Sequence, residues 1–520
     1  MALLTDSWRI HTLALLIGFV TLVYFYARRT YSYWERKGFA YLPDFNYVFG
    51  HFKPTFSQQE SMGMLVSRIY NSTKEPFIGI YSIFRPILII CDTELIRTIL
   101  IKDFNYFTDR GVHCNENYDP LSGHLFALPG QKWKNLRGKL SPTFTSGKLK
   151  AMFSTLVDCG ATLQSHLDKL ANKNELLDVR EISAAHATNV IASVAFGIEA
   201  DTIKNPNNDF RVCGRTIFES SIMNGIRLSL NFIAPKMMSI LRIKVVDGSV
   251  EKFIMSVVKD TLQYREQNNV SRKDFFQLLI QLRNTGTVQL DDQWETVIKA
   301  DEKQKTLSLN EIAAQSFVFF AAGFETSSTT LTFCMYELAK HPEIQKRVHE
   351  EIDSVLGQHN GKITYDSVTE MRYLEACIDE ILRKYPIVPL LNRTCTKDYK
   401  IPGTDKVIEK GTAVFIPVYA LQMDKNYYEQ PNQFKPERFL EEGSAAKNLV
   451  NKPYLPFGDG PRNCIGMRLG KMQTKVGLIL MLQKFQYELE PKLINREMEF
   501  DPKLFLLSSR VGINLRIFKR

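Results

Sequence analysis

The chain has 520 residues, of which 44% are hydrophobic and 23% are charged, as is ordinary for a folded globular protein. This composition excludes a disordered or fibrous chain. Lysine and arginine outnumber aspartate and glutamate by 66 to 56, which gives a net charge of +10. The surplus fits an acidic protein partner, an anionic lipid surface or simple solubility. No nucleic-acid recognition motif accompanies it, so we expect no nucleic acid to bind.

An apolar run near the N-terminus predicts a membrane anchor. Residues 10–26 are apolar apart from one histidine and two threonines, and basic residues follow at positions 28, 29, 36 and 37. By the positive-inside rule these basic residues keep the C-terminal side in the cytoplasm. We therefore expect a single anchor in the endoplasmic reticulum membrane, with the rest of the chain facing the cytosol. A cleaved signal peptide is the alternative because the run is short, although no small-residue cleavage site precedes the arginines.

The remaining chain lacks repeats and linkers rich in proline, glycine or serine, so we predict an anchor with its basic flank at 1–37 and one large domain at 38–520. Eight scattered cysteines indicate reduced thiols, as in a cytosolic domain. Residues 77–81 and 87–90 predict a β-hairpin.

Residues 228–246 are apolar but broken by Pro235 and by charges, which excludes a second membrane span. They predict a surface that dips into lipid, with an ordinary amphipathic helix pair as the alternative.

Two spacings along the chain are ambiguous when each is taken alone. Trp133 and Arg137 lie one helical turn apart, and Glu380 and Arg383 carry opposite charges three residues apart. Arginines and charge pairs of this kind are mostly solvated and contribute little. Their meaning therefore depends on the other motifs of the chain.

A long helix is predicted between Ser308 and Pro342. Ser308 and Glu311 form a capping-box pattern, and apolar residues at helical spacing follow until the proline. The middle of this helix reads Ala-Ala-Gly-Phe-Glu-Thr-Ser over 321–327. Glycine followed by carboxyl and hydroxyl groups is poor helix chemistry, so we expect the backbone hydrogen bonds to open locally.

The most specific pattern is Phe-Gly-Asp-Gly-Pro-Arg-Asn-Cys-Ile-Gly over 457–466. Apolar residues then recur at helical spacing from Leu469 to Phe485, so Cys464 lies at or just before a helix N-terminus, where the helix dipole favours a thiolate. Gly466 leaves room for a flat ligand near the sulfur. The glycines do not fit a dinucleotide-binding spacing, and no C-x-x-C pair or nearby histidine would complete a zinc site. The pattern therefore indicates a cysteine thiolate that binds a metal.

Taken together and in this order, these motifs resemble the cytochrome P450 monooxygenases over the whole of residues 133–466, most closely the insect detoxification members. The resemblance implies a mainly α (α+β) fold of one large helical domain with small β-sheets behind the anchor. It implies haem b as cofactor, with Cys464 as the axial ligand of the iron. The other implied haem-binding residues are Trp133, Arg137, Arg393, Phe457, Arg462 and Gly466.

The resemblance also implies roles away from the haem. Glu325 and Thr326 would form the acid–alcohol pair that delivers protons to dioxygen, whereas Glu380, Arg383 and Arg438 would form a buried structural triad. Substrate contacts would come from residues 104–128, 317–326, 387–391 and 504–507. Lysines and arginines near the cysteine would form a basic surface for an electron donor, at positions 132, 134, 139, 468, 471 and 475.

The implied function is oxidation of lipophilic small molecules by O₂, with xenobiotics such as plant toxins or insecticides as substrates. Since the chain has no nicotinamide or flavin motif, NADPH-derived electrons would come from a separate protein, NADPH–cytochrome P450 reductase, with cytochrome b5 as a second donor. The alternatives are a haem-thiolate isomerase or dehydratase, against which the intact Glu325 and Thr326 speak, and a non-catalytic haem protein that binds ligands.

Overall fold

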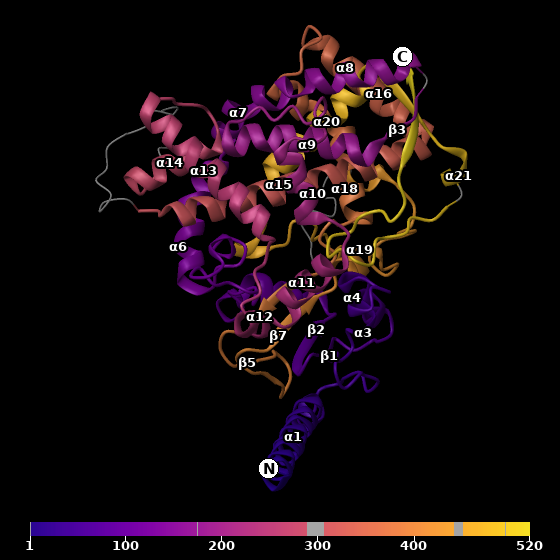
Figure 1. The fold of residues 1–520 in the computed structure, drawn as a ribbon. Helices are drawn as coiled ribbons and strands as arrows, with labels where there is room; N and C mark the ends of the chain where they lie inside the picture. Colours follow the sequence, from indigo (N-terminus) through magenta and orange to yellow (C-terminus); the bar gives the residue numbers. More distant parts are fainter. Residues whose placement is uncertain (1, 174, 289–305, 441–450, 495) are drawn as a thin grey trace.

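The computed structural model describes residues 2–520 except 174, 289–305, 441–450 and 495. Helix α1 (Ala2–Tyr31) projects from the body of the protein (Figure 1). Its segment Trp8–Tyr31 is 24 residues long, has a mean hydropathy of 1.9 and is almost entirely exposed. At 1.5 Å per residue it spans about 36 Å, enough to cross the hydrocarbon core of a bilayer. The described residues thus contain one helix suited to a membrane anchor, as predicted.

Most of the body is helical, in agreement with the predicted class. The shorter helices are α2 (Tyr33–Arg36), α3 (Lys53–Phe56), α5 (Thr93–Arg97), α12 (Pro235–Leu241), α17 (Tyr365–Glu370), α19 (Val418–Met423) and α21 (Pro491–Ile494). The longer ones are α4 (Met62–Asn71), α6 (Gly130–Leu140), α7 (Ser146–Asp158), α8 (Gly160–Lys173), α9 (Val179–Phe196), α10 (Asp209–Phe218), α11 (Ile222–Ile233), α13 (Gly248–Asn268), α14 (Phe275–Thr285), α15 (Leu309–Lys340), α16 (Pro342–Gln358), α18 (Arg372–Lys384) and α20 (Met467–Leu482).

Three small sheets complete the fold. The largest has the order β1-β2-β7-β4 and contains β1 (Phe77–Ser82), β2 (Arg85–Ile90), β7 (Ala413–Ile416) and β4 (Leu391–Thr394). The predicted hairpin is its β1–β2 pair, while β2 and β7 are parallel. A second sheet joins β3 (Leu177–Asp178), β9 (Asn514–Lys519) and β8 (Phe485–Leu489), and a third pairs β5 (Tyr399–Lys400) with β6 (Val407–Ile408). In Figure 1 the β1–β2 hairpin lies on the side of the body from which α1 projects.

Helix α15 runs through the centre of the body and packs against α9 and α20 (Figure 1). The predicted capping box is present, because Ser308 Oγ accepts from the Glu311 amide and the Glu311 carboxylate accepts from the Ser308 amide. Pro342 opens the next helix. The expected break in the middle is wrong: α15 is continuous. The Thr326 hydroxyl donates to the Ala322 carbonyl at 2.6 Å, so this polar side chain is accommodated within the helix.

Helix α20 follows the cysteine loop, as predicted, but it is shorter than its apolar periodicity suggests. It ends at Leu482, and Phe485 begins strand β8 instead of a further turn. The reason is a long-range contact, since Phe485 pairs with Lys519 in the antiparallel ladder with β9. From Gln473 onward the helix is buried on all faces.

The segment 228–246 forms a helix pair, α11 and α12, in which Pro235 occupies the first turn of α12. Figure 1 shows both helices on the α1 side of the body. Their outer faces carry exposed apolar side chains at Ile222, Met223, Ile240 and Leu241. The exposed apolar side chains are those expected of a surface that contacts lipid. The two helices are also the amphipathic helix pair expected under the alternative interpretation.

The charged triad lies in the core between α18 and the segment after it. The Arg383 guanidinium binds Glu380 through two bonds of 2.7 and 2.9 Å, and Arg438 Nε lies 3.3 Å from Glu380 Oε1. Glu380 and Arg383 are fully buried. Arg383 also donates to the backbone carbonyls of Gln422 and Pro431, so each nitrogen of its guanidinium group has a hydrogen-bond partner. The triad is buried, as predicted, and joins α18 to α19 and to the segment 431–438.

Candidate functional site

The site is built around the loop 457–466. Gly458 and Gly460 adopt φ angles of +68° and +69°, which side chains rarely tolerate. A Cβ atom on Gly460 would also lie 1.9 Å from the Leu100 carbonyl oxygen, so the loop fits only with glycine there. The Cys464 amide donates to the Phe457 carbonyl at 2.8 Å and closes the loop. Cys464 is thereby held three residues before α20.

We infer an internal hollow beside Cys464 from two properties of its side chain. Its surface is exposed, yet burial of the thiol is the largest influence on its pKa and raises it. A group that is both exposed and desolvated borders an enclosed space, which is the hollow. The Gly466 amide, Arg110 and Arg137 lower the same pKa, but not enough to outweigh burial. The Gly466 amide and the two arginines thus act in the expected direction, and a bound cation would add to them and favour the thiolate.

Two residues in the middle of α15 are also accessible. Ala322 is exposed and Thr326 half-buried, although the flanking Phe324 and Glu325 are buried. Since α15 packs against α20, which starts directly after the cysteine loop, we infer that these atoms and Cys464 border the same hollow. The described residues contain no group of three or more His, Cys, Asp or Glu that could hold a metal ion. Cys464 is the candidate ligand for a metal at this place.

Arg462 and Trp133 pack directly against each other beside the hollow. The Arg462 guanidinium lies over the Trp133 ring, 4.1 Å from its centroid, and is only 2% exposed. It donates to the carbonyls of Thr108, Phe126 and Leu128, which ties the loop before α6 to the cysteine loop. Three of its five N–H groups are used in this way. Arg462 thus holds the walls of the site together and retains donors for a ligand.

Arg137 and Arg393 reach the same region from α6 and β4. Arg137 donates to the carbonyl and the side-chain oxygen of Asn463, each at 2.9 Å, which places it next to Cys464. Arg393 is fully buried, and its Nε and Nη2 atoms have no partner. Burial lowers the pKa of Arg393 well below its usual range, and repulsion from Arg110 and Arg462 lowers it further. An unpartnered buried guanidinium of this kind indicates that an anion is missing.

Arg110 is a member of this cluster that the sequence did not single out. It stacks on the Phe126 ring at 4.1 Å and donates to the Arg462 carbonyl at 3.0 Å, while its Nε has no partner. Burial lowers its pKa to about 10. No motif marked it beyond its place in the segment 104–128, which was predicted to contact substrate. Its partner Arg462 is 352 residues away in sequence, so only the fold could reveal the contact.

The four arginines carry like charges that repel one another. A ligand that fits among them must therefore be negatively charged. Burial and the charges of Arg110 and Arg137 lower the pKa of Arg462 to about 9, against which Asp109, 3.9 Å away, gives partial compensation. A ligand with two carboxylates would neutralise this excess and fill the unused donors. Haem carries two propionates beside an iron that accepts a thiolate, so the residues present fit haem.

The predicted acid–alcohol pair is divided between two faces of α15. Adjacent residues on a helix point in different directions. Thr326 is half-buried beside the exposed Ala322, whereas Glu325 is 6% exposed. Burial raises the pKa of Glu325, while Arg180 and Arg211, on the α9 and α10 side, lower it. The structure therefore places the hydroxyl at the hollow and the carboxyl behind it.

The predicted basic surface is smaller than expected. Lys475 is buried and donates to the Val368 carbonyl and to Glu375, and Lys471 binds Glu375 and Asp379. Lys132 pairs with Glu116. Glu375 lies 100 residues from Lys475 and Glu116 lies 16 residues from Lys132, so neither was visible in the local pattern. The remaining members of the predicted surface are Lys134, Lys139 and Arg468.

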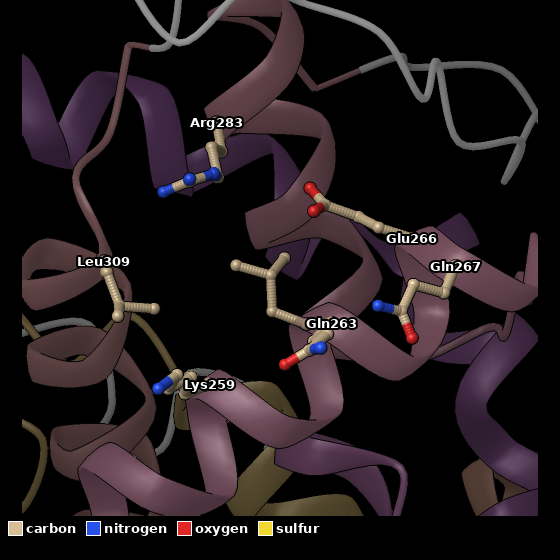
Figure 2. Close-up of a pocket in the computed structure, with 7 residues that line it drawn as sticks. Lys259, Gln263, Glu266, Gln267, Arg283 and Leu309 are labelled. Carbon is tan, nitrogen blue, oxygen red and sulfur yellow. The ribbon is translucent and has the colours of Figure 1, made fainter.

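A pocket of about 310 Å³ lies elsewhere, between α13, α14 and the start of α15 (Figure 2). Polar side chains such as Lys259, Gln263 and Glu266 line it. Leu309 at its edge precedes Thr326 by 17 residues on one continuous helix, or about 26 Å. This pocket is therefore separate from the hollow beside Cys464.

A helical body with small sheets, a cysteine held before a helix and an arginine cluster fit for two propionates define a haem-thiolate protein. The chain matches the cytochrome P450 family profile over residues 42–514. It is 40% identical to "Probable cytochrome P450 6d4" of Drosophila melanogaster over 510 residues, covering 97% of this chain and 98% of that one. It is also 40% identical to "Cytochrome P450 6k1" of Blattella germanica, covering 100% and 99%. "Cytochrome P450 6d3" of Musca domestica is 39% identical, covering 98% and 99%. The chain belongs to the cytochrome P450 family and is an oxidoreductase of the monooxygenase type.

Proposed function

We propose that this protein is a membrane-anchored monooxygenase that inserts one oxygen atom of O₂ into lipophilic xenobiotics such as plant toxins or insecticides, while the other atom leaves as water. The observation that carries the proposal is the convergence on Cys464 of two buried arginines, Arg393 and Arg462, and two half-buried ones, Arg110 and Arg137. Its similarity to insect members of the family supports xenobiotic substrates. Residues 38–520 would act as one catalytic domain.

The haem would be held from two directions. Cys464 Sγ would bind the haem iron, and Gly466 and Phe457 would help to hold the haem beside it. The propionates would take the free donors of Arg110, Arg137, Arg393 and Arg462, with Trp133 supporting the last of these. When bound, haem supplies the iron at which O₂ is bound and reduced.

The residues on α15 would handle protons and water. Thr326 Oγ1 now donates to the Ala322 carbonyl, and a rotation about χ1 would turn it toward the hollow. Glu325, whose pKa is raised by burial, holds its proton more readily than an ordinary carboxyl and would relay it from the α10 side. Aromatic side chains on the substrate side exclude water: Phe232 stacks on Phe505 at 4.2 Å and contacts Phe126.

Electrons would come from NADPH through a separate flavoprotein, NADPH–cytochrome P450 reductase, with cytochrome b5 as a second donor. The face that carries Lys134, Lys139 and Arg468 would bind the acidic surface of such a donor. The anchor α1 would lie in the endoplasmic reticulum membrane. Arg28 and Arg29 at its end would keep the catalytic domain in the cytosol.

A reconstituted turnover assay tests the proposed function. The purified full-length protein is combined with the reductase, NADPH and a panel of plant toxins and insecticides. We expect oxygenated products that require both NADPH and O₂ and that carry ¹⁸O from ¹⁸O₂. Turnover of hydroperoxides without NADPH would instead identify an isomerase or dehydratase, and ligand binding without any product would identify a binding protein.

Replacing Thr326 by alanine is expected to uncouple NADPH consumption from product formation. The hydroxyl at the hollow would position the protons used on O₂, and positioned proton-transfer groups contribute on the order of a hundredfold or more. NADPH would still be consumed, but it would yield hydrogen peroxide. The matched control is Thr332→Ala, because Thr332 makes the same bond to a carbonyl four residues earlier but is buried deeper in the helix packing. Unchanged coupling in Thr326→Ala would remove this residue from the mechanism.

A further inference from the structure

Helix α1 ends in a socket of aromatic side chains on the body of the protein. Its last residue, Tyr31, is only 5% exposed. Between ring centroids, Tyr31 lies 4.6 Å from Phe45, 5.2 Å from Tyr81 and 6.0 Å from both Tyr47 and Phe84, which are separations of favourable aromatic pairs. The Tyr31 hydroxyl donates to the Tyr47 carbonyl at 3.1 Å, so the buried side chain is also satisfied. We call Phe45, Tyr47, Tyr81 and Phe84 the aromatic socket.

The residues that follow α1 are fixed to strand β1. Trp34 is 1% exposed, its amide donates to the Tyr81 hydroxyl at 3.1 Å, and its indole nitrogen donates to the Ile80 carbonyl at 2.9 Å. A Cβ atom on Gly79 would lie 2.4 Å from the Trp34 ring, so the indole fits against β1 because position 79 is glycine. Tyr81 thus contacts both the end of α1 and the residue three positions after it.

The chain that joins the anchor to the body is itself paired with β1. The Gly79 amide donates to the Ala40 carbonyl at 2.8 Å, and the Leu42 amide donates to the Gly79 carbonyl at 3.0 Å. Closer to α1, the Tyr33 hydroxyl donates to Glu409 at 2.8 Å. Paired backbone groups leave this stretch little freedom to bend. It therefore lacks the properties of a flexible linker.

The socket and the candidate site belong to the same sheet. Tyr81 lies on β1, at one edge of the order β1-β2-β7-β4, and Arg393 lies on β4 at the other edge. Neighbouring strands are about 4.8 Å apart, so about 14 Å separate the two edges. Helix α1 also contacts β2 where it reaches the body (Figure 1). Holding α1 against this sheet therefore also fixes its direction relative to Arg393.

We propose that the aromatic socket fixes the angle between the membrane anchor and the catalytic domain, so that the chain itself sets the tilt of the Cys464 site over the bilayer. A flexible attachment would instead leave the tilt to contacts between the domain and the lipid. That α1 lies in a bilayer rests on the proposed function. The contacts that hold the end of α1 to the sheet do not depend on it.

Trypsin cleavage of the full-length protein in phosphatidylcholine nanodiscs tests the socket. Exposed basic residues flank Tyr31 at positions 28, 29, 36 and 37. Trypsin cuts at such sites when the local structure opens. Tyr31→Ala and Phe45→Ala each remove one ring of the 4.6 Å pair, so we expect cleavage at these sites about 10- to 100-fold faster. Mass spectrometry of the products identifies the cleaved bonds.

Tyr24→Ala is the matched control, because Tyr24 also lies on α1 but is 57% exposed. It should be cleaved at the rate of the parent. Tyr31→Phe keeps the ring but loses the hydrogen bond to the Tyr47 carbonyl, so we expect a folded protein that is cleaved about two- to tenfold faster.

Cleavage at the parent rate in Tyr31→Ala, Phe45→Ala and Tyr31→Phe would overturn the proposal. In the double variant, Tyr31→Ala with Phe45→Ala, we expect the rate of the faster single variant, because both changes remove the same contact. An acceleration equal to the product of the two single ones would show independent effects and would also overturn it. A protein that does not enter nanodiscs would contradict the proposed location instead.

The decay of polarised absorption of the haem-loaded protein in vesicles measures the tilt itself. A domain fixed to α1 rotates only about the membrane normal, which leaves a residual anisotropy at long times. We expect Tyr31→Ala to lose most of this residual anisotropy, whereas Tyr24→Ala should keep it. Equal residual anisotropy in the parent and in Tyr31→Ala would show that the socket does not set the tilt and would overturn the proposal. A chain that binds no haem would give no signal and would contradict the proposed function instead.

Discussion

Replacing Glu380 by alanine is expected to lower the free energy of unfolding by about 3–5 kcal/mol. The loss is large because Arg383 would remain as a buried cation without its carboxylate, while Arg438 would lose the same partner. Urea unfolding of the full-length protein, followed by circular dichroism, measures the change. Because the triad joins α18 to loops far away in sequence, we expect the protein to unfold at lower urea without a separate early transition.

Glu350→Ala is the matched control for this variant. Glu350 also lies on a helix and near a lysine, with Lys346 Nζ 3.9 Å away, but both side chains are largely exposed. Exposed pairs contribute about 0–1 kcal/mol, so this variant should unfold almost like the parent. A loss below about 1 kcal/mol in Glu380→Ala would show that the triad is not a buried stabilising element.

Replacing Arg393 by methionine is expected to stabilise the haem-free protein and to weaken haem binding. Without haem, the guanidinium is fully buried with two unpartnered nitrogens, so its removal should raise the free energy of unfolding by about 1–3 kcal/mol. With haem, the same substitution removes a charge-assisted bond to a propionate. We expect haem to bind about 10- to 100-fold more weakly, which corresponds to about 1.5–3 kcal/mol.

The two effects are measured by urea unfolding of each form and by transfer of haem to an acceptor protein. Arg68→Met serves as the control, because Arg68 is largely exposed and pairs with Glu60 at the surface. It should leave both forms within about 1 kcal/mol of the parent. If Arg393→Met destabilised the haem-free protein as much as the loaded one, the arginine cluster would have a structural role and no need of an anion.

The parts of the fold that were predicted correctly are encoded by local signals. The capping box at Ser308 and the proline at 342 fixed the ends of α15, and Gly458 and Gly460 marked the turn before Cys464. The parts that were not predicted depend on partners far along the chain. Phe485 continues the helical spacing of α20, but pairing with Lys519 makes it a strand residue.

The same distinction holds for the site. The motif order identified Trp133, Arg137, Arg393 and Arg462, whose convergence the structure then showed. Arg110 was missed because its contact with the Arg462 carbonyl spans 352 residues. The prediction that Lys475 belongs to the basic surface was wrong, because Lys475 is buried and Glu375, 100 residues away in sequence, lies against it. The amide of Gly466 lowers the pKa of the Cys464 thiol as expected, but the opposing effect of burial could not be seen in the sequence.

The absorption spectrum of the reduced, carbon monoxide-bound protein tests the central claim most directly, with Cys464→Ser measured beside the parent. We expect the parent to show the strongly red-shifted band of thiolate-ligated haem, and the serine variant to lose that band and most of its haem. A parent spectrum typical of imidazole-ligated haem, or a serine variant that keeps the red-shifted band, would show that Cys464 does not hold the iron.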